Sequence, residues 1–251
     1  MREFDFFDLN LTLGRPRIPK LRVETDAAVM KADLAAVGIS GGLVRHMLSV
    51  EWHPTEGNAE LSRTLERTPA FEPVWAVLPH WTGEFPPPDD LARDMAANRV
   101  RAVIMYPQLH GFHVRPSVTG PLLEMLAVKR VLLLLPFAEA DLGVVETIAR
   151  NHPTLAVVVS DTPYSFAREL YAVFTACPNV FVEISGYMVH RGIEDIVNRF
   201  GEERLVFGSR YPSYNPGCAV AAVLYARIPD DAKAAIAGRN AKSLIAKAVL
   251  T

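Results

Sequence analysis

A few polar residues in this sequence have types and spacings that could support acid–base chemistry. His110 and His113 form an H-x-x-H pair directly after Tyr106 and Pro107. Because imidazole titrates near neutral pH, His110 could act as a general acid or base. The alternative is a pair of loop histidines hydrogen-bonded to backbone carbonyls. A newly evolved metal site built from His80, His110 and His113 is a third interpretation.

Two carboxylates stand at or near the ends of apolar segments. Asp161 follows one such segment and could be a proton-transferring base or the N-cap of the next helix. Glu183 lies inside the apolar run 181–184, where an ionised carboxylate is costly to bury unless it is paired. Arg45 and Arg210 are the candidate partners of Glu183, in a structural ion pair or in a functional site.

Eight short apolar segments alternate with amphipathic stretches, and these elements must position the polar groups. Runs such as Val131–Leu135 are continuously apolar, which is typical of parallel strands covered by helices. We expect strands at 4–13, 42–48, 71–78, 101–106, 131–137, 155–160, 179–185 and 204–209. Helices are expected near 25–37, 58–67, 89–98, 118–128, 139–151, 164–176, 191–200, 217–227 and 230–247.

The number and size of these units predict a single-domain α/β (β/α)8 TIM barrel over 1–251, with an extra C-terminal helix. Eight strands in 251 residues give about 31 residues per strand–helix unit, as expected for βαβ steps. A doubly wound open sheet is the main competitor, but it usually carries a phosphate-binding glycine fingerprint. The glycine-rich segment Gly38–Gly42 precedes a strand instead of opening a helix, which favours the barrel.

Composition excludes several classes of protein. The chain is 50% apolar, and 26 Lys and Arg against 28 Asp and Glu leave a net charge of −2. This balance provides neither the basic excess of a nucleic-acid-binding protein nor a polybasic membrane-binding segment. No apolar run approaches the roughly 20 residues that span a bilayer, and the first residues do not resemble a signal peptide. Cys177 and Cys218 form no zinc-ligand pattern. We expect a cytoplasmic protein.

Six motifs follow one another along the chain: Asp8–Gly14, Gly57–Leu61, Tyr106-Pro107, Asn179–Gly186, Leu205–Pro212 and Gly238–Leu244. They resemble those of the amidohydrolase-related family, the predicted metal-dependent hydrolases of the TIM-barrel fold. Asp8–Gly14 resembles the Asp-x-His-x-His segment of the family's first strand. Tyr106-Pro107 resembles the end of its fourth strand, and Leu205–Pro212 resembles its eighth-strand Leu-x-Phe-Gly-Ser-Asp-Tyr-Pro. Further similar segments are Gly57–Leu61, Asn179–Gly186 and Gly238–Leu244. The resemblance covers nearly the whole chain and implies a site at the C-terminal rim of a barrel.

The metal ligands that this resemblance implies are absent from the sequence. The family's two first-strand histidines are replaced by Asn10 and Thr12, and its eighth-strand aspartate by Arg210. Its histidines after strands five and six are replaced by Pro136-Phe137 and Ser160-Asp161-Thr162. An amide, a hydroxyl and a guanidinium cannot replace imidazole and carboxylate, and a guanidinium repels a cation. We therefore expect no metal and no other cofactor.

Together these features predict a metal-independent hydrolase acting on a lactone or a related acyl substrate that carries an anionic group. Arg210 would hold that group, Asp161 or His110 would transfer protons, and Asn10 and Tyr106 would orient the substrate. The family resemblance implies that Asp8, Asn10 and Thr12 share the inward face of their strand. The other side chains expected to bind substrate are Thr12, Arg45, Glu183 and Tyr211.

Two other functions stay open. The first is a catalytically silent barrel that binds a small acid or a protein partner. The second is a hydrolase or decarboxylase with a relocated metal site. The expected ligand is in most of these cases a small anionic molecule, and the chain could form a homo-oligomer.

Overall fold

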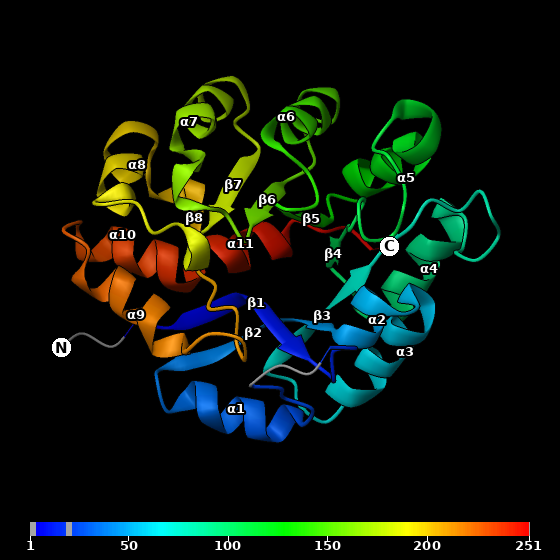
Figure 1. Cartoon of the computed structure of the whole chain (residues 1–251), viewed down its shortest axis with the longest axis horizontal. Helices are drawn as coiled ribbons and strands as arrows, with labels where there is room; N and C mark the ends of the chain where they lie inside the picture. Colours follow the sequence, from blue (N-terminus) through cyan, green and yellow to red (C-terminus); the bar gives the residue numbers. More distant parts are fainter. Residues whose placement is uncertain (1–3, 19–21, 251) are drawn as a thin grey trace.

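The computed structural model describes residues 4–18 and 22–250, which form a ring of parallel strands surrounded by helices (Figure 1). The strands are β1 (Phe6–Leu13), β2 (Ile39–His46), β3 (Phe71–Ala76), β4 (Ala102–Ile104), β5 (Leu132–Pro136), β6 (Val157–Ser160), β7 (Val180–Glu183) and β8 (Leu205–Val206). They pair in sequence order. Leu9 N donates to Phe207 O and Thr12 N to Tyr211 O, each at 3.0 Å, and these bonds link the segment that follows β8 back to β1. The predicted (β/α)8 TIM barrel is therefore confirmed.

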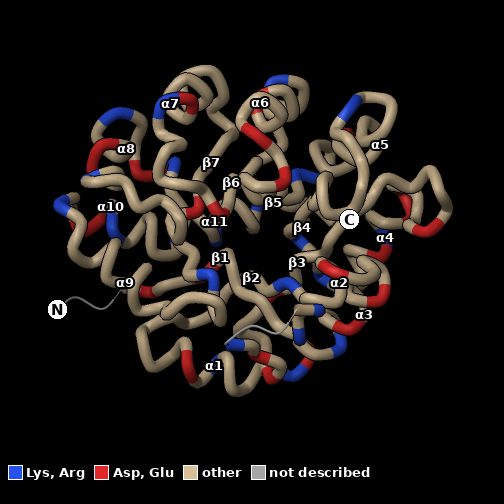
Figure 2. The backbone as a smooth tube through the Cα atoms, in the orientation of Figure 1, with Lys and Arg blue, Asp and Glu red and all other residues tan. Residues whose placement is uncertain are grey.

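Helices cover the outside of the ring (Figure 1). They are α1 (Ala27–Ala35), α2 (Met47–Glu51), α3 (Pro54–Leu65), α4 (Pro88–Ala97), α5 (Pro116–Val128), α6 (Leu142–Asn151), α7 (Ala167–Ala176), α8 (Gly192–Phe200), α9 (Pro216–Tyr225), α10 (Asp230–Ala234) and α11 (Asn240–Ala246). Acidic and basic residues are interspersed over these helices (Figure 2). In the described part of the chain, no helix has the length and apolarity needed to cross a membrane.

The expected C-terminal helix is present as α10, a π-helical turn at Ala235–Arg239, and α11. The side-chain amide of Asn240 donates to Glu202 O and Leu205 O, both at 2.8 Å, which fixes α11 beside the start of β8. The apolar residues Leu244 and Ile245 join the cluster that fills the barrel interior. Because α11 closes the N-terminal end of the barrel, the interior is reached from the C-terminal end of the strands.

The side chains of β1 do not alternate regularly between the inside and the outside of the barrel. Leu9 belongs to the interior apolar cluster and Leu11 to the outer one. The pairing of β1 with β2 shifts register between Asp8 and Leu11, as at a β-bulge. The Asp8 carboxylate accepts hydrogen bonds from Asn10 N at 2.8 Å and Ser209 N at 3.1 Å. The expectation that Asp8, Asn10 and Thr12 share one face is therefore wrong, because the bulge separates Asp8 from the others.

Candidate functional site

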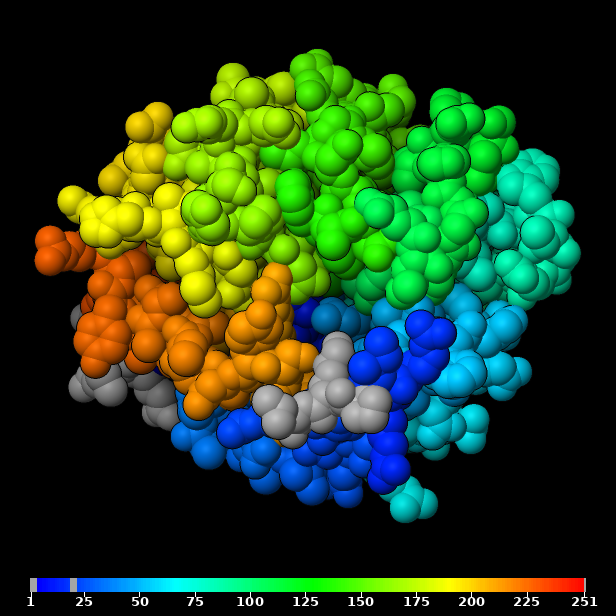
Figure 3. All heavy atoms as spheres, in the orientation of Figure 1, coloured from blue at the N-terminus to red at the C-terminus, as the bar shows by residue number. Residues whose placement is uncertain are grey.

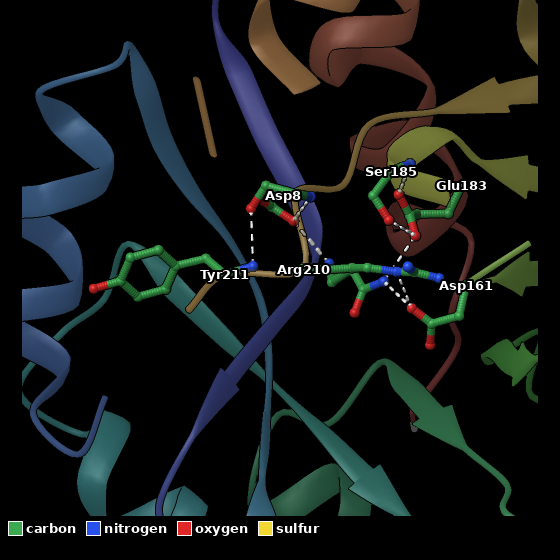
Figure 4. A network of polar contacts seen from close by, with 8 residues as sticks. Asp8, Asp161, Glu183, Ser185, Arg210 and Tyr211 are labelled. Carbon is green, nitrogen blue, oxygen red and sulfur yellow. Dashed lines mark hydrogen bonds and ion pairs between the residues drawn. The ribbon is translucent and has the colours of Figure 1, made fainter. Parts of the chain in front are cut away.

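Asn10 is the centre of a polar network at the C-terminal ends of four strands. Figure 4 labels other members of this network, Asp161, Glu183, Ser185 and Arg210. The side-chain nitrogen of Asn10 donates to Glu183 Oε2 at 2.7 Å and to Asp161 Oδ1 at 3.1 Å. Because both bonds use the NH2 group, the orientation of the amide is fixed. Its oxygen, Oδ1, is buried and has no hydrogen-bond partner. Asn10 thus joins two carboxylates and leaves one acceptor unused.

Arg210 forms an ion pair with Asp161, with 2.5 Å between Nε and Oδ1. Both residues have left-handed backbones, with φ of 58° at Arg210 and 57° at Asp161. Such conformations are uncommon outside glycine and are often found at functional sites. The guanidinium also lies over the ring of Tyr214, 5.4 Å from its centroid.

These contacts correct two expectations. The turn after β6 is preceded by Pro163, so Asp161 is not its N-cap. The ion-pair partner of Arg210 is Asp161 and not Glu183.

Glu183 is buried at the end of β7, with 0% of its surface exposed. Ser185 donates to it twice, from N at 2.5 Å and from Oγ at 2.8 Å. A Cβ atom at position 208 would lie 2.5 Å from Glu183 Cδ, so Gly208 leaves the space that the carboxylate fills. Burial and the neighbouring Asp161 raise the pKa of Glu183 from 4.5 to about 7, although Asn10 and Ser185 oppose the shift.

Asp8 is a second buried carboxylate with a raised pKa. Burial raises this pKa from 3.8 to about 6, and hydrogen bonds from Ser209 and Asn10 and the charge of Arg45 limit the increase. Asp8 Oδ1 accepts the two backbone amides described above, whereas Oδ2 is buried without a partner.

Arg45 lies on β2, two residues after the inward-facing Leu43, and its side chain is partly buried. Burial opposes its charge, but Tyr106 and the carboxylates of Asp161 and Glu183 outweigh that effect and raise its pKa. No hydrogen bond or ion pair joins its guanidinium to any residue in the described ranges. Arg45 is therefore a cation that is stabilised by charges at a distance while its N–H donors are unused.

Further unpartnered polar atoms come from β6 and from the residues after β4. Tyr106 and Ser160 each lie two residues after an interior residue of their strand, Ile104 and Val158. Both hydroxyls are buried without hydrogen-bond partners, and burial raises the pKa of Tyr106. Figure 3 shows a hollow near the centre of the molecule, between green and orange segments, with blue atoms from the first part of the chain at its base.

The three histidines proposed as a site, His80, His110 and His113, have different surroundings in the structure. His110 packs its ring against Tyr106, with 5.5 Å between centroids, and its Nε2 lies 2.9 Å from Val50 O. Since a carbonyl only accepts, Nε2 carries the proton, and the buried Nδ1 has no partner. Burial lowers the pKa of His110. His113 is exposed, and His80 packs against a tryptophan.

Two other predicted residues lie at the seam between β1 and the segment after β8. Thr12 is partly buried at the end of β1, where its backbone bonds to Tyr211. The Tyr211 hydroxyl donates to Asp33 on α1 at 2.8 Å, and its side chain points away from Arg210 (Figure 4). Tyr211 is therefore not a mouth residue, because the left-handed backbone at Arg210 changes the direction of the chain just before it.

The sequence prediction missed Ser160, Ser185 and Gly208 as parts of this site. Ser160 could have been found from alternation, since it follows the interior Val158 by two residues. Ser185 and Gly208 gain their roles only from their contact with Glu183, which no sequence pattern indicates.

The residues at this mouth do not fit the divalent metal that the family resemblance implies. At those positions the chain offers the amide of Asn10, the hydroxyl of Thr12 and the guanidinium of Arg210, which is already paired with Asp161. Among residues 4–18 and 22–250, no three or more His, Cys, Asp or Glu side chains gather as a metal site would require. The relocated site of His80, His110 and His113 gains no support from this arrangement.

Comparison with known proteins agrees with the fold. A family model described as amidohydrolase matches residues 22–245. No curated protein matches the sequence. An uncharacterized TIM-barrel protein from Bordetella bronchiseptica is 20% identical, with a TM-score of 0.74 over 97% of this chain and 99% of that one.

Two further solved structures are similar. A 5-carboxyvanillate decarboxylase from Novosphingobium aromaticivorans with bound manganese is 13% identical, with a TM-score of 0.80 and 97% of each chain covered. A putative 2-pyrone-4,6-dicarboxylic acid hydrolase from Pseudomonas putida is 18% identical, with a TM-score of 0.72 over 99% of this chain and 100% of that one. These identities establish a shared fold. Since the family model spans most of the sequence, the chain belongs to the amidohydrolase family.

Proposed function

We propose that the barrel mouth binds a small anionic molecule and hydrolyses an activated acyl bond in it, such as that of a lactone. The observation that carries this proposal is the guanidinium of Arg45, which has no hydrogen-bond or ion-pair partner among the described residues and lies near Tyr106, whose hydroxyl is also unpartnered. The unpartnered oxygen of Asn10 lies at the same end of the barrel. Unused buried polar groups in a native protein call for a partner such as a ligand or water.

The anion-binding role fits Arg45 better than Arg210. Arg210 already donates from Nε to Asp161, so an anion that bound its remaining N–H donors would lie beside that carboxylate, which repels it. Arg45 can donate to a ligand without losing a protein contact, and its planar group suits a carboxylate. We therefore assign the anionic group of the ligand to Arg45, and to Arg210 a role in fixing Asp161.

The ligand should also carry a hydrogen-bond donor. Asn10 Oδ1 can only accept, so an O–H or N–H group on the ligand would satisfy it. The Tyr106 hydroxyl can donate to a carbonyl oxygen of the same molecule. The names of two structural neighbours, a carboxyvanillate decarboxylase and a putative dicarboxylic acid hydrolase, refer to carboxylic acids, which supports this ligand class.

In the proposed hydrolysis, the oxygen of water forms a bond to the acyl carbon as the bond to the leaving oxygen breaks. A base takes a proton from the water, and the leaving oxygen receives a proton. Asp161 and His110 are the proposed proton-transferring residues, His110 through the unpartnered Nδ1. A strained ester such as a lactone needs less electrophilic help, because it starts closer to its transition state.

The alternative is a silent barrel that binds an acid without catalysis. The ion pair between Asp161 and Arg210 favours it, because the Asp161 oxygen that accepts from the guanidinium is not free to take a proton from water. A test of turnover must therefore accompany a test of binding.

The test compares wild type with Arg45→Met in a thermal-shift screen of glycolate, small lactones and phosphate. Arg93→Met is the matched control, because Arg93 is an exposed residue of α4. Binding to the native state should stabilise wild type and the control by about 2.7 kcal/mol at a hundredfold excess over Kd. Equal stabilisation of Arg45→Met would overturn the assignment. Acid release from lactones in a pH-stat separates the hydrolase from the silent barrel.

A further inference from the structure

Four ionisable side chains gather at the mouth, and a fifth, Asp8, lies on the other face of β1 but close enough to act electrostatically on Arg45. The carboxylates are Asp8 on β1, Asp161 after β6 and Glu183 on β7, and the guanidinium groups are Arg45 on β2 and Arg210 after β8. When all five are ionised, three negative charges face two positive ones. The cluster then carries one net negative charge before any ligand enters.

This excess negative charge is unevenly distributed. Asp161 contacts Arg210, and Asp8 accepts two backbone amides at the β1–β8 seam. Glu183 is fully buried and accepts hydrogen bonds from neutral groups alone, on Asn10 and Ser185. Of the three carboxylates, Glu183 therefore gains most from taking up a proton.

We infer that an anionic ligand enters this mouth together with one proton, which Glu183 takes up, and that the preferred ligand carries a single negative charge. The inference rests on the proposed anion site at Arg45. A second negative charge near Glu183 would disfavour its carboxylate, and protonation removes that repulsion. A dianion would need a further proton or cation that the cluster does not supply.

The surroundings of Glu183 suit both protonation states. When it is ionised, the Ser185 hydroxyl donates to Oε2. When Oε2 is protonated, this hydroxyl can rotate and accept, since a serine oxygen serves in both roles. The bond from Ser185 N to Oε1 is kept in either state. Gly208 places no side chain against the carboxyl group, and burial already raises its pKa to about 7.

The experiment is calorimetric titration with glycolate and with malonate in two buffers of different ionisation enthalpy, from pH 6 to 9. Wild type should bind glycolate more tightly than malonate and take up a fraction of a proton at pH 7.5. Its affinity should fall by up to about tenfold per pH unit above pH 7. Glu183→Gln should bind glycolate with no proton uptake and no such pH dependence. Glu72→Gln, which removes a carboxylate paired with Arg101, is the matched control and should behave as wild type.

The outcomes separate the two proposals. Glycolate binding to wild type without proton uptake, or uptake that persists in Glu183→Gln, would overturn this inference and leave the anion site intact. No binding to wild type would overturn both. If Glu183→Gln fails to fold, 13C NMR of labelled glutamate carboxyls in wild type tests whether a glutamate takes up the proton. One carboxyl resonance must shift toward the protonated position on glycolate binding, and an unchanged spectrum of the bound protein overturns the inference.

Discussion

Replacing Glu183 by glutamine should change how the stability of the protein depends on pH. Burial and Asp161 raise the pKa of Glu183 from 4.5 to about 7 in the folded protein. Between these values the unfolded chain has lost its proton while the folded chain still holds it. The free energy of unfolding therefore decreases as pH rises from 4.5 to 7, and the loss is complete above the folded pKa.

The size of the effect follows from the two pKa values. One pKa unit corresponds to about 1.4 kcal/mol, so ionising Glu183 costs the folded protein about 3 kcal/mol by pH 8. Glutamine has nearly the same shape and does not ionise. Its oxygen can accept from Ser185 N while its NH2 group donates to Ser185 Oγ, but this NH2 group then faces the NH2 group of Asn10. The resulting loss of stability is the same at every pH and does not change the pH profile.

The assay is urea unfolding of wild type and Glu183→Gln at pH 5, 6, 7 and 8. The stability of the variant relative to wild type should rise by about 2–3 kcal/mol over this range. Asp8, whose pKa is raised to about 6, titrates in both proteins, so its contribution cancels. Parallel pH profiles would show that Glu183 stays ionised throughout, and the charge argument at the mouth would fail.

Three further substitutions test the architecture of the site. Gly208→Ala places a Cβ against the buried carboxyl group of Glu183 and should destabilise the protein by about 1–3 kcal/mol in urea unfolding. The control is Gly120→Ala on α5, where a Cβ would meet no other atom, and it should be neutral or stabilising. Arg210→Met leaves Asp161 without its ion-pair partner and should lower stability by about 1–3 kcal/mol, yet leave the thermal shift with glycolate in place. Loss of that thermal shift would return the anion to Arg210. Tyr211→Phe removes the hydrogen bond to Asp33 on α1 and should lower the free energy of unfolding by about 1–2 kcal/mol without changing glycolate binding. Weakened glycolate binding would show that Tyr211 lines the barrel mouth.

The fold could be predicted because its signals are local. A run such as Val131–Leu135 is apolar on both faces, and only a strand buried on both sides needs that pattern. The predicted positions of Arg45 and Glu183 at the mouth follow from the same reasoning, since alternation from an interior residue continues to the end of each strand. The positions of these two residues can be predicted because each depends on the sequence of a single strand.

The contacts inside the site depend on several strands at once and could not be predicted. The bulge at Asp8 is set by the pairing of β1 with its neighbours, so strict alternation gave that carboxylate the wrong face. The choice of Asp161 as the partner of Arg210 depends on two left-handed residues, one after β6 and one after β8. Neither residue is glycine, so the sequence contained no signal for either turn.

The two arginines show why contact decides function more than charge does. Arg45 and Arg210 carry the same charge and both interact with Asp161, so a count of charges assigns them equal roles. Arg210 contacts Asp161 through Nε, so an anion that binds its other N–H donors lies next to that carboxylate and is repelled by it. Arg45 is held by charges at a distance, so a ligand that binds it displaces only solvent and adds hydrogen bonds. Arg45, which has no hydrogen bond or ion pair with any residue that the structure describes, is therefore the arginine we assign to the anion.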